Sequence, residues 1–154
     1  MQLSNYHSHC TFCDGRSTPE DFIKFAVAHG FRAYGFSSHS PLPFETFWNM
    51  SKDDMPEYLT EIERLKKKYS DRLEIYVGLE IDFLDESYNA SIPYFRNLPL
   101  DYRIGSIHFL HSRLRKRIWC VSTVLSGNTR SLSTPTTTEI SASWSPTISV
   151  PHGE

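Results

Sequence analysis

The chain has 154 residues, of which 39% are hydrophobic and 14% aromatic, enough apolar surface to bury one sizeable core and to predict a single domain. A formal net charge of -2 argues against nucleic acid or an anionic membrane surface as a bulk electrostatic partner. Three cysteines, an odd number, do not make a disulfide framework and favour a reducing compartment.

The amino-terminal residues show no features of a targeting sequence. Residues 1–5 lack a basic segment followed by an apolar core, and no apolar run approaches the length that spans a bilayer. A cytoplasmic protein that does not act at a membrane is therefore expected.

Predicted strands and helices then alternate along the chain. Leu3–His9 is predicted to be a short strand. A helix is predicted from the capping residue Thr18, which a proline and two acidic residues follow, to Gly30. Phe31–Ser37 is a second predicted strand, and residues 38–43 are expected to form a loop because two prolines forbid regular pairing.

The alternation continues to about residue 107. An aromatic loop, Phe44–Met50, is typical of a packed lid or cover, and a second helix is predicted to begin near Asp54. Leu73–Leu79 is a third predicted strand, and a weaker helical stretch, Ser87–Phe95, separates it from a fourth, Tyr102–Ile107. This order implies right-handed crossovers and a parallel sheet, so the predicted fold class is α/β.

Metal-binding side chains stand at the end of the first predicted strand. His7 and His9 point the same way because side chains alternate along a strand, and Asp14 adds an oxygen ligand after a turn. The alternative is one buried, hydrogen-bonded histidine beside a surface histidine. The Cys10-x-x-Cys13 pair has its own alternatives: small packing residues, the favoured interpretation, a soft metal ligand, or a redox pair.

The next three predicted strands end in the same kinds of side chain. His39 follows the second strand, Glu80 and Asp82 close the third and share a face, and His108 ends the fourth. Parallel α/β sheets place ligands and catalytic groups at the carboxyl ends of their strands. Each residue alone has an ordinary explanation, as a satisfied buried histidine or a solvated carboxylate. Four strand ends in a row favour a shared metal site.

Five segments keep a fixed order and spacing: Tyr6-His7-Ser8-His9, Asp14-Gly15, Gly35-Phe36-Ser37-Ser38-His39-Ser40-Pro41, Gly78-Leu79-Glu80-Ile81-Asp82 and Gly105-Ser106-Ile107-His108-Phe109. As a set they resemble the motifs of the polymerase and histidinol phosphatase (PHP) superfamily, most closely its histidinol-phosphatase branch. The resemblance covers about residues 3–110. It implies the first four βα units of a distorted (β/α)7 TIM-like barrel.

The resemblance also implies a site with up to three divalent metal ions, zinc, iron or manganese. It assigns His7, His9 and Glu80 to one ion, Glu80 as a bridge with His108 to a second, and Asp14 with His39 to a third. The family's chemistry uses a metal-activated water, with no protein nucleophile, to hydrolyse a phosphate monoester. Asp82 either orients one of the metal-binding side chains or contacts the amine of the substrate.

The branch implies that the substrate is L-histidinol phosphate, a small-molecule phosphate monoester, which is hydrolysed to L-histidinol and phosphate in histidine biosynthesis. Another PHP-type phosphoesterase, acting on a nucleotide or a nucleic-acid end, is one alternative, and a non-catalytic metal-binding remnant is another. The acidic N-terminal segment and the lack of a basic groove count against a polynucleotide.

The composition changes after Leu110. Residues 1–111 carry a net charge of -5 and residues 112–154 one of +3, and the latter contain 16 Ser or Thr but no Asp, Phe or Tyr. We expect residues 1–110 to be the N-terminal part of a PHP domain, and residues 111–154 to be a disordered, low-complexity tail outside the family. A frameshift, a truncation or a native flexible tail would each produce this break.

The expected barrel is longer than the matching segment. A barrel of this kind occupies about 250 residues, and its later metal ligands are not visible in the sequence. We therefore expect weak or absent phosphatase activity from the 154-residue product, and association through the open sheet edge of residues 1–110.

Overall fold

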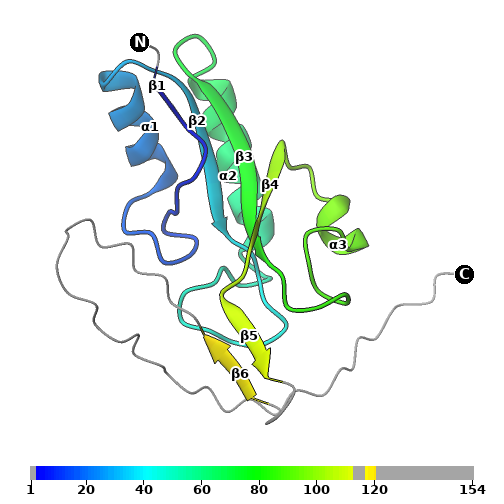
Figure 1. Ribbon diagram of the computed structural model, residues 1–154. Coiled ribbons are helices and arrows are strands. Elements are labelled where there is room, and N and C mark those ends of the chain that lie inside the picture. The colour runs from blue at the N-terminus through cyan, green and yellow to red at the C-terminus, as the bar shows by residue number, and fades with distance from the viewer. Residues whose placement is uncertain (1–2, 113–116, 121–154) are drawn as a thin grey trace, which may run out of the picture.

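The computed structural model describes residues 3–112 and 117–120 (Figure 1). Its centre is one parallel sheet of four strands in the order β1-β2-β3-β4. The strands are β1 (Leu3–Asn5), β2 (Phe31–His39), β3 (Glu74–Asp82) and β4 (Tyr102–Ser106). The predicted α/β class and parallel sheet are confirmed.

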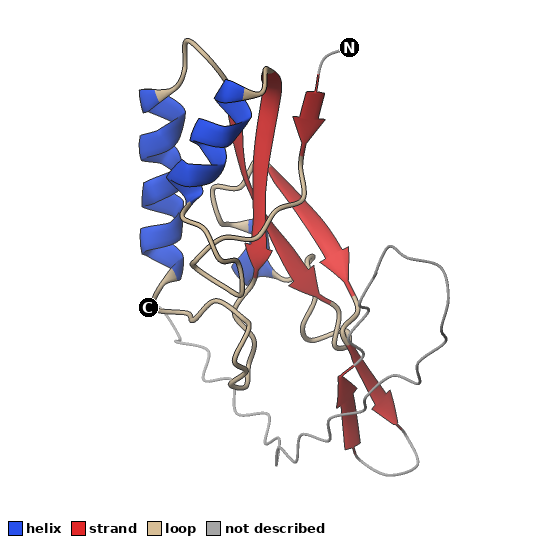
Figure 2. Cartoon of the chain, turned by 90° about the vertical axis from the view of Figure 1, so that its left-hand side faces the viewer, coloured by secondary structure: helices blue, strands red, loops and turns tan. Residues whose placement is uncertain are grey.

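Two helices lie side by side on one face of this sheet (Figure 2). Helix α1 (Pro19–Ala28) begins after Thr18, whose side chain accepts a hydrogen bond from Asp21 N at 3.2 Å, as the capping pattern predicts. The chain leaves α1 through Gly30, at a positive φ of 70° that favours glycine. Helix α2 (Met55–Lys68) ends in a run of lysines.

The core lies between these helices and the sheet. β3 is buried along most of its length, and the fully buried side chains include Phe36 of β2, Val77 and Leu79 of β3, and Ile62 and Leu65 of α2. Residues three or four positions apart on each helix supply this apolar face, which packing on the sheet removes from water.

The carboxyl ends of the first three strands differ from the predicted ones, and β3 runs to Asp82 rather than to Leu79. β2 continues through Ser38 and His39, which pair with Leu79 and Glu80, so the expectation of a loop from residue 38 is wrong. The prolines at 41 and 43 restrict the chain only after this point. β1 ends at Asn5 rather than at residue 9. The side chain of Asn5 accepts a hydrogen bond from the backbone N of His7 at 3.1 Å, which turns the chain out of the strand.

The predicted helix at Ser87–Phe95 is mostly a set of turns. The carboxylate of Asp85 accepts hydrogen bonds from the backbone N of Ser87 and of Tyr88, which offers the backbone an alternative to a helix. Only α3 (Pro93–Arg96) is helical.

A hairpin follows β4. β5 (Phe109–Ser112) pairs antiparallel with β6 (Arg117–Cys120), across the boundary expected at residue 110. The rest of the expected tail, residues 113–116 and 121–154, lies outside the described residues. Among the helices that the structure describes, none combines the length and apolar character needed to cross a membrane.

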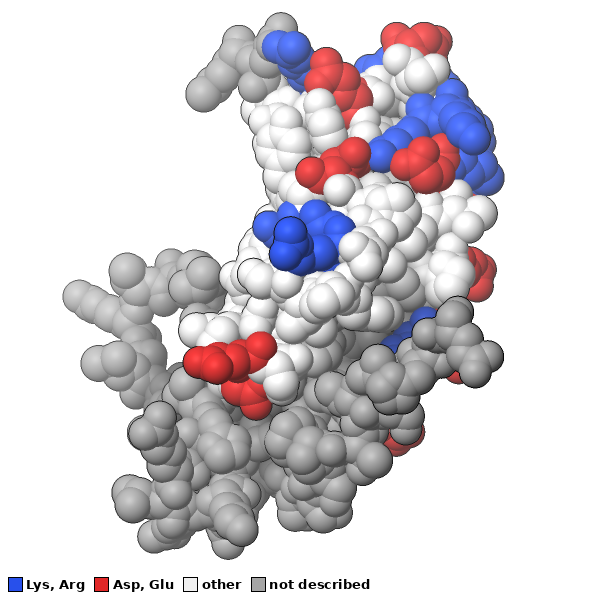
Figure 3. All heavy atoms as spheres, turned by 90° about the vertical axis from the view of Figure 1, so that its right-hand side faces the viewer, with Lys and Arg blue, Asp and Glu red and all other residues white. Residues whose placement is uncertain are grey.

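The surface that Figure 3 shows carries both signs of charge at its upper end, and below this it is mostly uncharged, with a blue patch near the middle and a red patch at the lower left. Ion pairs hold the last turns of α2 in place: Lys66 Nζ lies 2.7 Å from a carboxylate oxygen of Glu63 and 2.7 Å from one of Asp101. The lysine run predicted to be a solvated helix end is therefore neutralised in part by carboxylates.

Candidate metal centre

The carboxyl ends of β2, β3 and β4 lie close together in the sheet, since β3 ends opposite the last residue of β4 and two residues beyond the last residue of β2. His39 of β2 and Glu80 of β3 are register partners. The segment after β1 joins this edge because Ser37 N donates to Ser8 O at 2.9 Å and Ser8 N donates to Ser37 Oγ at 3.2 Å. Ser8 is thus turned toward β2.

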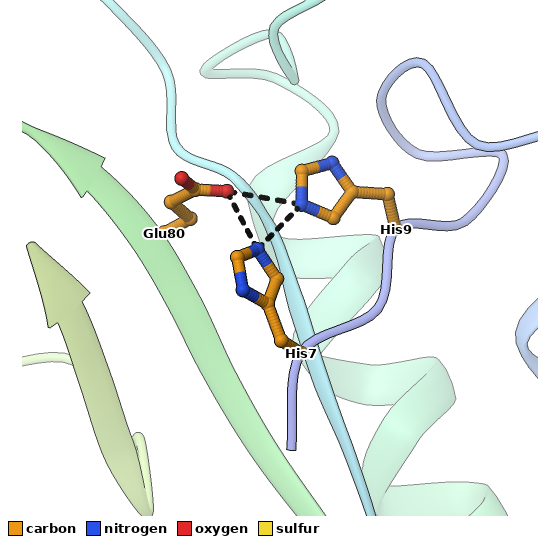
Figure 4. A group of neighbouring side chains, drawn as sticks. All are labelled: His7, His9 and Glu80. Carbon is orange, nitrogen blue, oxygen red and sulfur yellow. Dashed lines mark hydrogen bonds and ion pairs between the residues drawn. The ribbon is translucent and has the colours of Figure 1, made fainter. Parts of the chain in front are cut away.

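His7 and His9, on either side of Ser8, point away from β2 and toward Glu80 (Figure 4). Their Nε2 atoms lie 3.2 Å apart, and each lies 3.0 Å from Glu80 Oε2. One carboxylate oxygen therefore meets two imidazole nitrogens. The shared partner favours a ligand pair, in which the side chain of His7 is 55% exposed and that of His9 is 21% exposed.

Asp14 reaches the same centre from the loop after His9. Its Oδ1 lies 3.0 Å from His9 Nδ1, and its Oδ2 lies 3.9 Å from His39 Nε2. The loop doubles back tightly, since Gly15 N donates to Cys10 O at 3.2 Å. A Cβ at Gly15 would lie 2.3 Å from the carbonyl carbon of His9, so only glycine allows this approach.

His108, which follows β4, is held by Asp82. The carboxylate of Asp82 accepts hydrogen bonds from the Nδ1 and the backbone N of His108, at 2.8 and 3.0 Å. The opposite ring nitrogen, Nε2, then faces Glu80 Oε1 at 3.7 Å. Carboxylates that fix a histidine in this way are a regular feature of metal sites.

The structure thus brings together every candidate ligand that the sequence indicates. They form three overlapping groups whose ligand atoms lie within 4.8 Å of one another: His7, His9 and Glu80; His9, Asp14 and His39; and His39, Glu80 and His108. Neutral imidazole and carboxylate are ligands that zinc, iron and manganese accept.

The charges of the centre are strongly coupled. Burial alone raises the pKa of Glu80, but hydrogen bonds from His9 and His7 and the charge of His39 lower it to about 2. Burial opposes protonation of His9, yet its hydrogen bonds to Cys13, Glu80 and Asp14 raise the pKa to about 10. Without a bound cation, a proton on His9 therefore supplies the positive charge that the carboxylates attract.

Burial and the charge of His9 lower the pKa of His39 to about 4, so His39 is neutral near pH 7. Its buried Nδ1 has no hydrogen-bond partner among the described residues. This nitrogen lies 3.6 Å from Glu80 Oε2, and a buried ring nitrogen without a hydrogen bond is costly unless a cation or a water meets it.

The His7, His9 and Glu80 atoms form a triangle with edges of 3.0 to 3.2 Å. Protons on His7 and His9 satisfy the two edges that reach Glu80 and leave the two nitrogens facing each other, whereas a cation at the centre satisfies all three edges. Ligands at the usual zinc–nitrogen distance in a tetrahedral site lie about 3.3 Å apart. The donor set therefore fits a divalent metal ion.

Trp48 is a residue of the centre that the sequence did not single out. Its ring lies 4.4 Å from that of His39 and 5.2 Å from that of His108, between centroids. The loop Phe44–Met50 was expected to be a cover, but no spacing distinguishes Trp48 from the neighbouring aromatic residues. Only the contact itself identifies it.

The family model of the PHP domain matches residues 5–130. The chain belongs to the PHP domain family. The matched range extends past residue 110, and the domain boundary expected there stays a prediction.

This PHP domain is similar to histidinol-phosphatases of known sequence. It is 33% identical over 125 residues to the histidinol-phosphatase of Bacillus subtilis, covering 73% of this chain and 46% of the relative. It is 32% identical over 110 residues to that of Lactococcus lactis, covering 70% of this chain and 40% of the relative. The chain thus spans less than half the length of these relatives.

Solved structures support the fold. A Listeria monocytogenes protein superposes with a TM-score of 0.64 at 24% identity, covering 80% of this chain and 50% of that one. The histidinol phosphate phosphatase of Lactococcus lactis, solved with zinc, L-histidinol and phosphate, gives a TM-score of 0.57 at 27% identity. That match covers 70% of this chain and 40% of the other. The four-stranded parallel sheet is accordingly consistent with part of a TIM-like barrel.

Proposed function

We propose that this PHP domain is part of a metal-dependent phosphomonoester hydrolase that converts L-histidinol phosphate to L-histidinol and phosphate. The observation that carries the proposal is the convergence of four histidines and two carboxylates from consecutive strand ends into three overlapping ligand groups. The similarity to histidinol-phosphatases, one of them solved with zinc, L-histidinol and phosphate, supports this choice of substrate. A place in histidine biosynthesis, in the cytoplasm, belongs to the same proposal.

The ligand assignment follows the three groups. His7, His9 and Glu80 would hold one cation, and Glu80 would bridge to a second that His108 also binds. Asp14 and His39 would hold a third. Bound divalent cations supply Lewis acidity, which lowers the pKa of a water and neutralises charge on a phosphoryl group.

Glu80 would serve two ligand groups at once. Its Oε2 faces His7 and His9, and its Oε1 faces His108. The pKa of about 2 keeps this carboxylate ionised at every pH at which the fold is expected to persist. Glu80 therefore contributes a fixed negative charge at the point where the groups overlap.

Asp82 acts through His108. Its carboxylate accepts a hydrogen bond from His108 Nδ1, which turns Nε2 toward the centre, and the same bond raises the pKa of His108. The proposed reaction needs no nucleophile from the chain, because the attacking group is water.

Phosphate release from L-histidinol phosphate tests the proposal. The full chain, loaded with zinc or manganese, is compared with E80Q and with the matched control E86Q, whose side chain is exposed. We expect metal-dependent turnover far below that of the Bacillus subtilis relative, lost in E80Q and unchanged in E86Q. Turnover of nucleotides alone would indicate another phosphoesterase, and bound metal with no turnover of any phosphomonoester would indicate a non-catalytic remnant.

A further inference from the structure

The aromatic loop after β2 is tied to the candidate metal centre at its far end. Asn49 Nδ2 donates to Ser40 O at 2.7 Å, and Met50 N donates to His39 O at 3.3 Å. Met50 is buried. These bonds return the chain to the carboxyl end of β2, so the loop that carries residues 44–48 begins and ends beside His39.

Trp48 packs between Phe109 and two histidines of the candidate metal centre. Phe109, at the start of β5, lies nearly parallel to the indole, with 5.7 Å between centroids and an interplanar angle of 14°. His39 and His108 meet the indole edge to face, at interplanar angles of 73° and 72°. Trp48 is only half-buried.

The position of this indole relative to the ligand groups is specific. Two of the three residues in the group His39, Glu80 and His108 touch it. Among the ring pairs of the described residues, it is the one ring other than histidine that contacts a candidate ligand. It therefore forms a wall of the centre that is apolar and partly open to solvent.

Resting on the function proposed above, we infer that Trp48 contacts the organic part of the substrate and selects for a cationic or planar group there. A phosphate monoester whose phosphoryl group occupied the centre would carry its alcohol next to the phosphorus, so the alcohol could contact only the walls of the centre, of which Trp48 is one. The L-histidinol moiety carries an ammonium group and an imidazole ring. An indole attracts a cation over its face more strongly than any other side chain, and it stacks on planar rings.

Separate binding of the two products distinguishes this role from a structural one. The metal-loaded full chain is titrated by calorimetry with L-histidinol and, independently, with inorganic phosphate. We expect W48L to weaken L-histidinol binding about 5- to 10-fold, the range of a cation–π or stacking contact, and to leave phosphate binding within about 2-fold. W48F, which keeps a ring, should bind L-histidinol within about 3-fold of the unchanged chain.

Phe47 supplies the matched control, because its side chain is 96% exposed. F47L removes a ring from the same loop and should leave both affinities unchanged. The inference is overturned if the unchanged chain does not bind L-histidinol, if W48L weakens phosphate and L-histidinol equally, or if F47L has the effect of W48L. Failure of the proposed function is a different result: L-histidinol binds in a Trp48-dependent way, yet no phosphate is released from L-histidinol phosphate.

Discussion

Asp82 determines which nitrogen of His108 faces the candidate metal centre, although it belongs to none of the three ligand groups. Its carboxylate is buried, and it binds both the ring and the backbone N of His108. The sequence left open whether it orients a ligand or meets the substrate's amine. The contact with His108 favours the first role.

The variant D82N tests this role. An amide still fills the space but lacks the charge that holds the Nδ1 proton, so the ring of His108 loses its fixed orientation. We expect metal affinity to fall about 10- to 100-fold, measured by competition with a chelator. D53N, at an exposed loop position, is the control, and a circular-dichroism melt verifies that D82N folds. An unchanged metal affinity in D82N would contradict the role of Asp82 in orienting His108.

A second residue-level prediction concerns the glycine of β3 that faces Tyr102. A Cβ at Gly78 would lie 2.6 Å from the Tyr102 ring, and that ring cannot easily move because its hydroxyl lies 2.8 and 2.9 Å from two backbone carbonyl oxygens. We expect G78A to lower the free energy of unfolding by about 1–3 kcal/mol. G105A in β4 adds a Cβ that meets nothing within 4 Å, so it should change stability little. Urea unfolding of both variants measures the difference.

At the level of elements, one carboxylate joins the two helices. Glu20 of α1 lies 2.7 Å from Arg64 Nη2 and 2.5 Å from Lys68 Nζ of α2, and it accepts a hydrogen bond from Tyr69. Lys68 first, and then Arg64 and Tyr69, lower the pKa of Glu20 to about 2. A carboxyl group whose pKa is lower in the folded state stabilises the fold above its ordinary pKa and loses this effect as the pH falls.

The variant E20Q removes this titration. Glu20 stabilises the fold above about pH 4.5, and the contribution disappears as the pH falls toward 2. The destabilisation in E20Q should therefore be present at pH 7, at about 1 kcal/mol because the pairs are partly exposed, and should vanish near pH 2. Urea unfolding at pH 7, 4 and 2.5 measures it, with E57Q on the exposed start of α2 as control. A constant difference across this range would contradict the assignment.

The sequence predicts the order of these elements well because their ends carry strong local signals. Thr18 caps α1, and Gly30 ends it at a positive φ. It predicts the end of β2 poorly, because pairing with β3 carries Ser38 and His39 past the expected boundary. Pairing between strands that are distant in sequence cannot be predicted from the conformational preferences of the residues themselves.

The same distinction holds for the centre. His7, His9, Glu80 and His108 are indicated by their places at strand ends, and the parallel register then brings them together. The choice of His108 nitrogen depends on Asp82, and the wall beside His39 depends on the path of the loop that carries Trp48. Neither follows from spacing, since each is a contact between separate elements.

At the level of the whole molecule, the sheet of the described residues ends at β1 and β4, each with one neighbour. Large apolar side chains are exposed near these edges: Leu3 at 43%, and Ile107, just after β4, at 61%. Unpaired backbone groups beside exposed apolar side chains favour pairing with another chain.

We therefore expect the full chain to associate in solution, with a sedimentation coefficient that rises with protein concentration. I107K places a charge beside β4 and should shift this equilibrium toward the monomer, because burying an unpaired lysine at an interface is costly. K52E, in an exposed loop away from both edges, controls for a charge change alone. Equal urea midpoints for I107K and the unchanged chain would show that the fold is intact. A concentration-independent monomer in the unchanged chain would contradict the prediction, since the two edges would then be closed by residues of the chain itself.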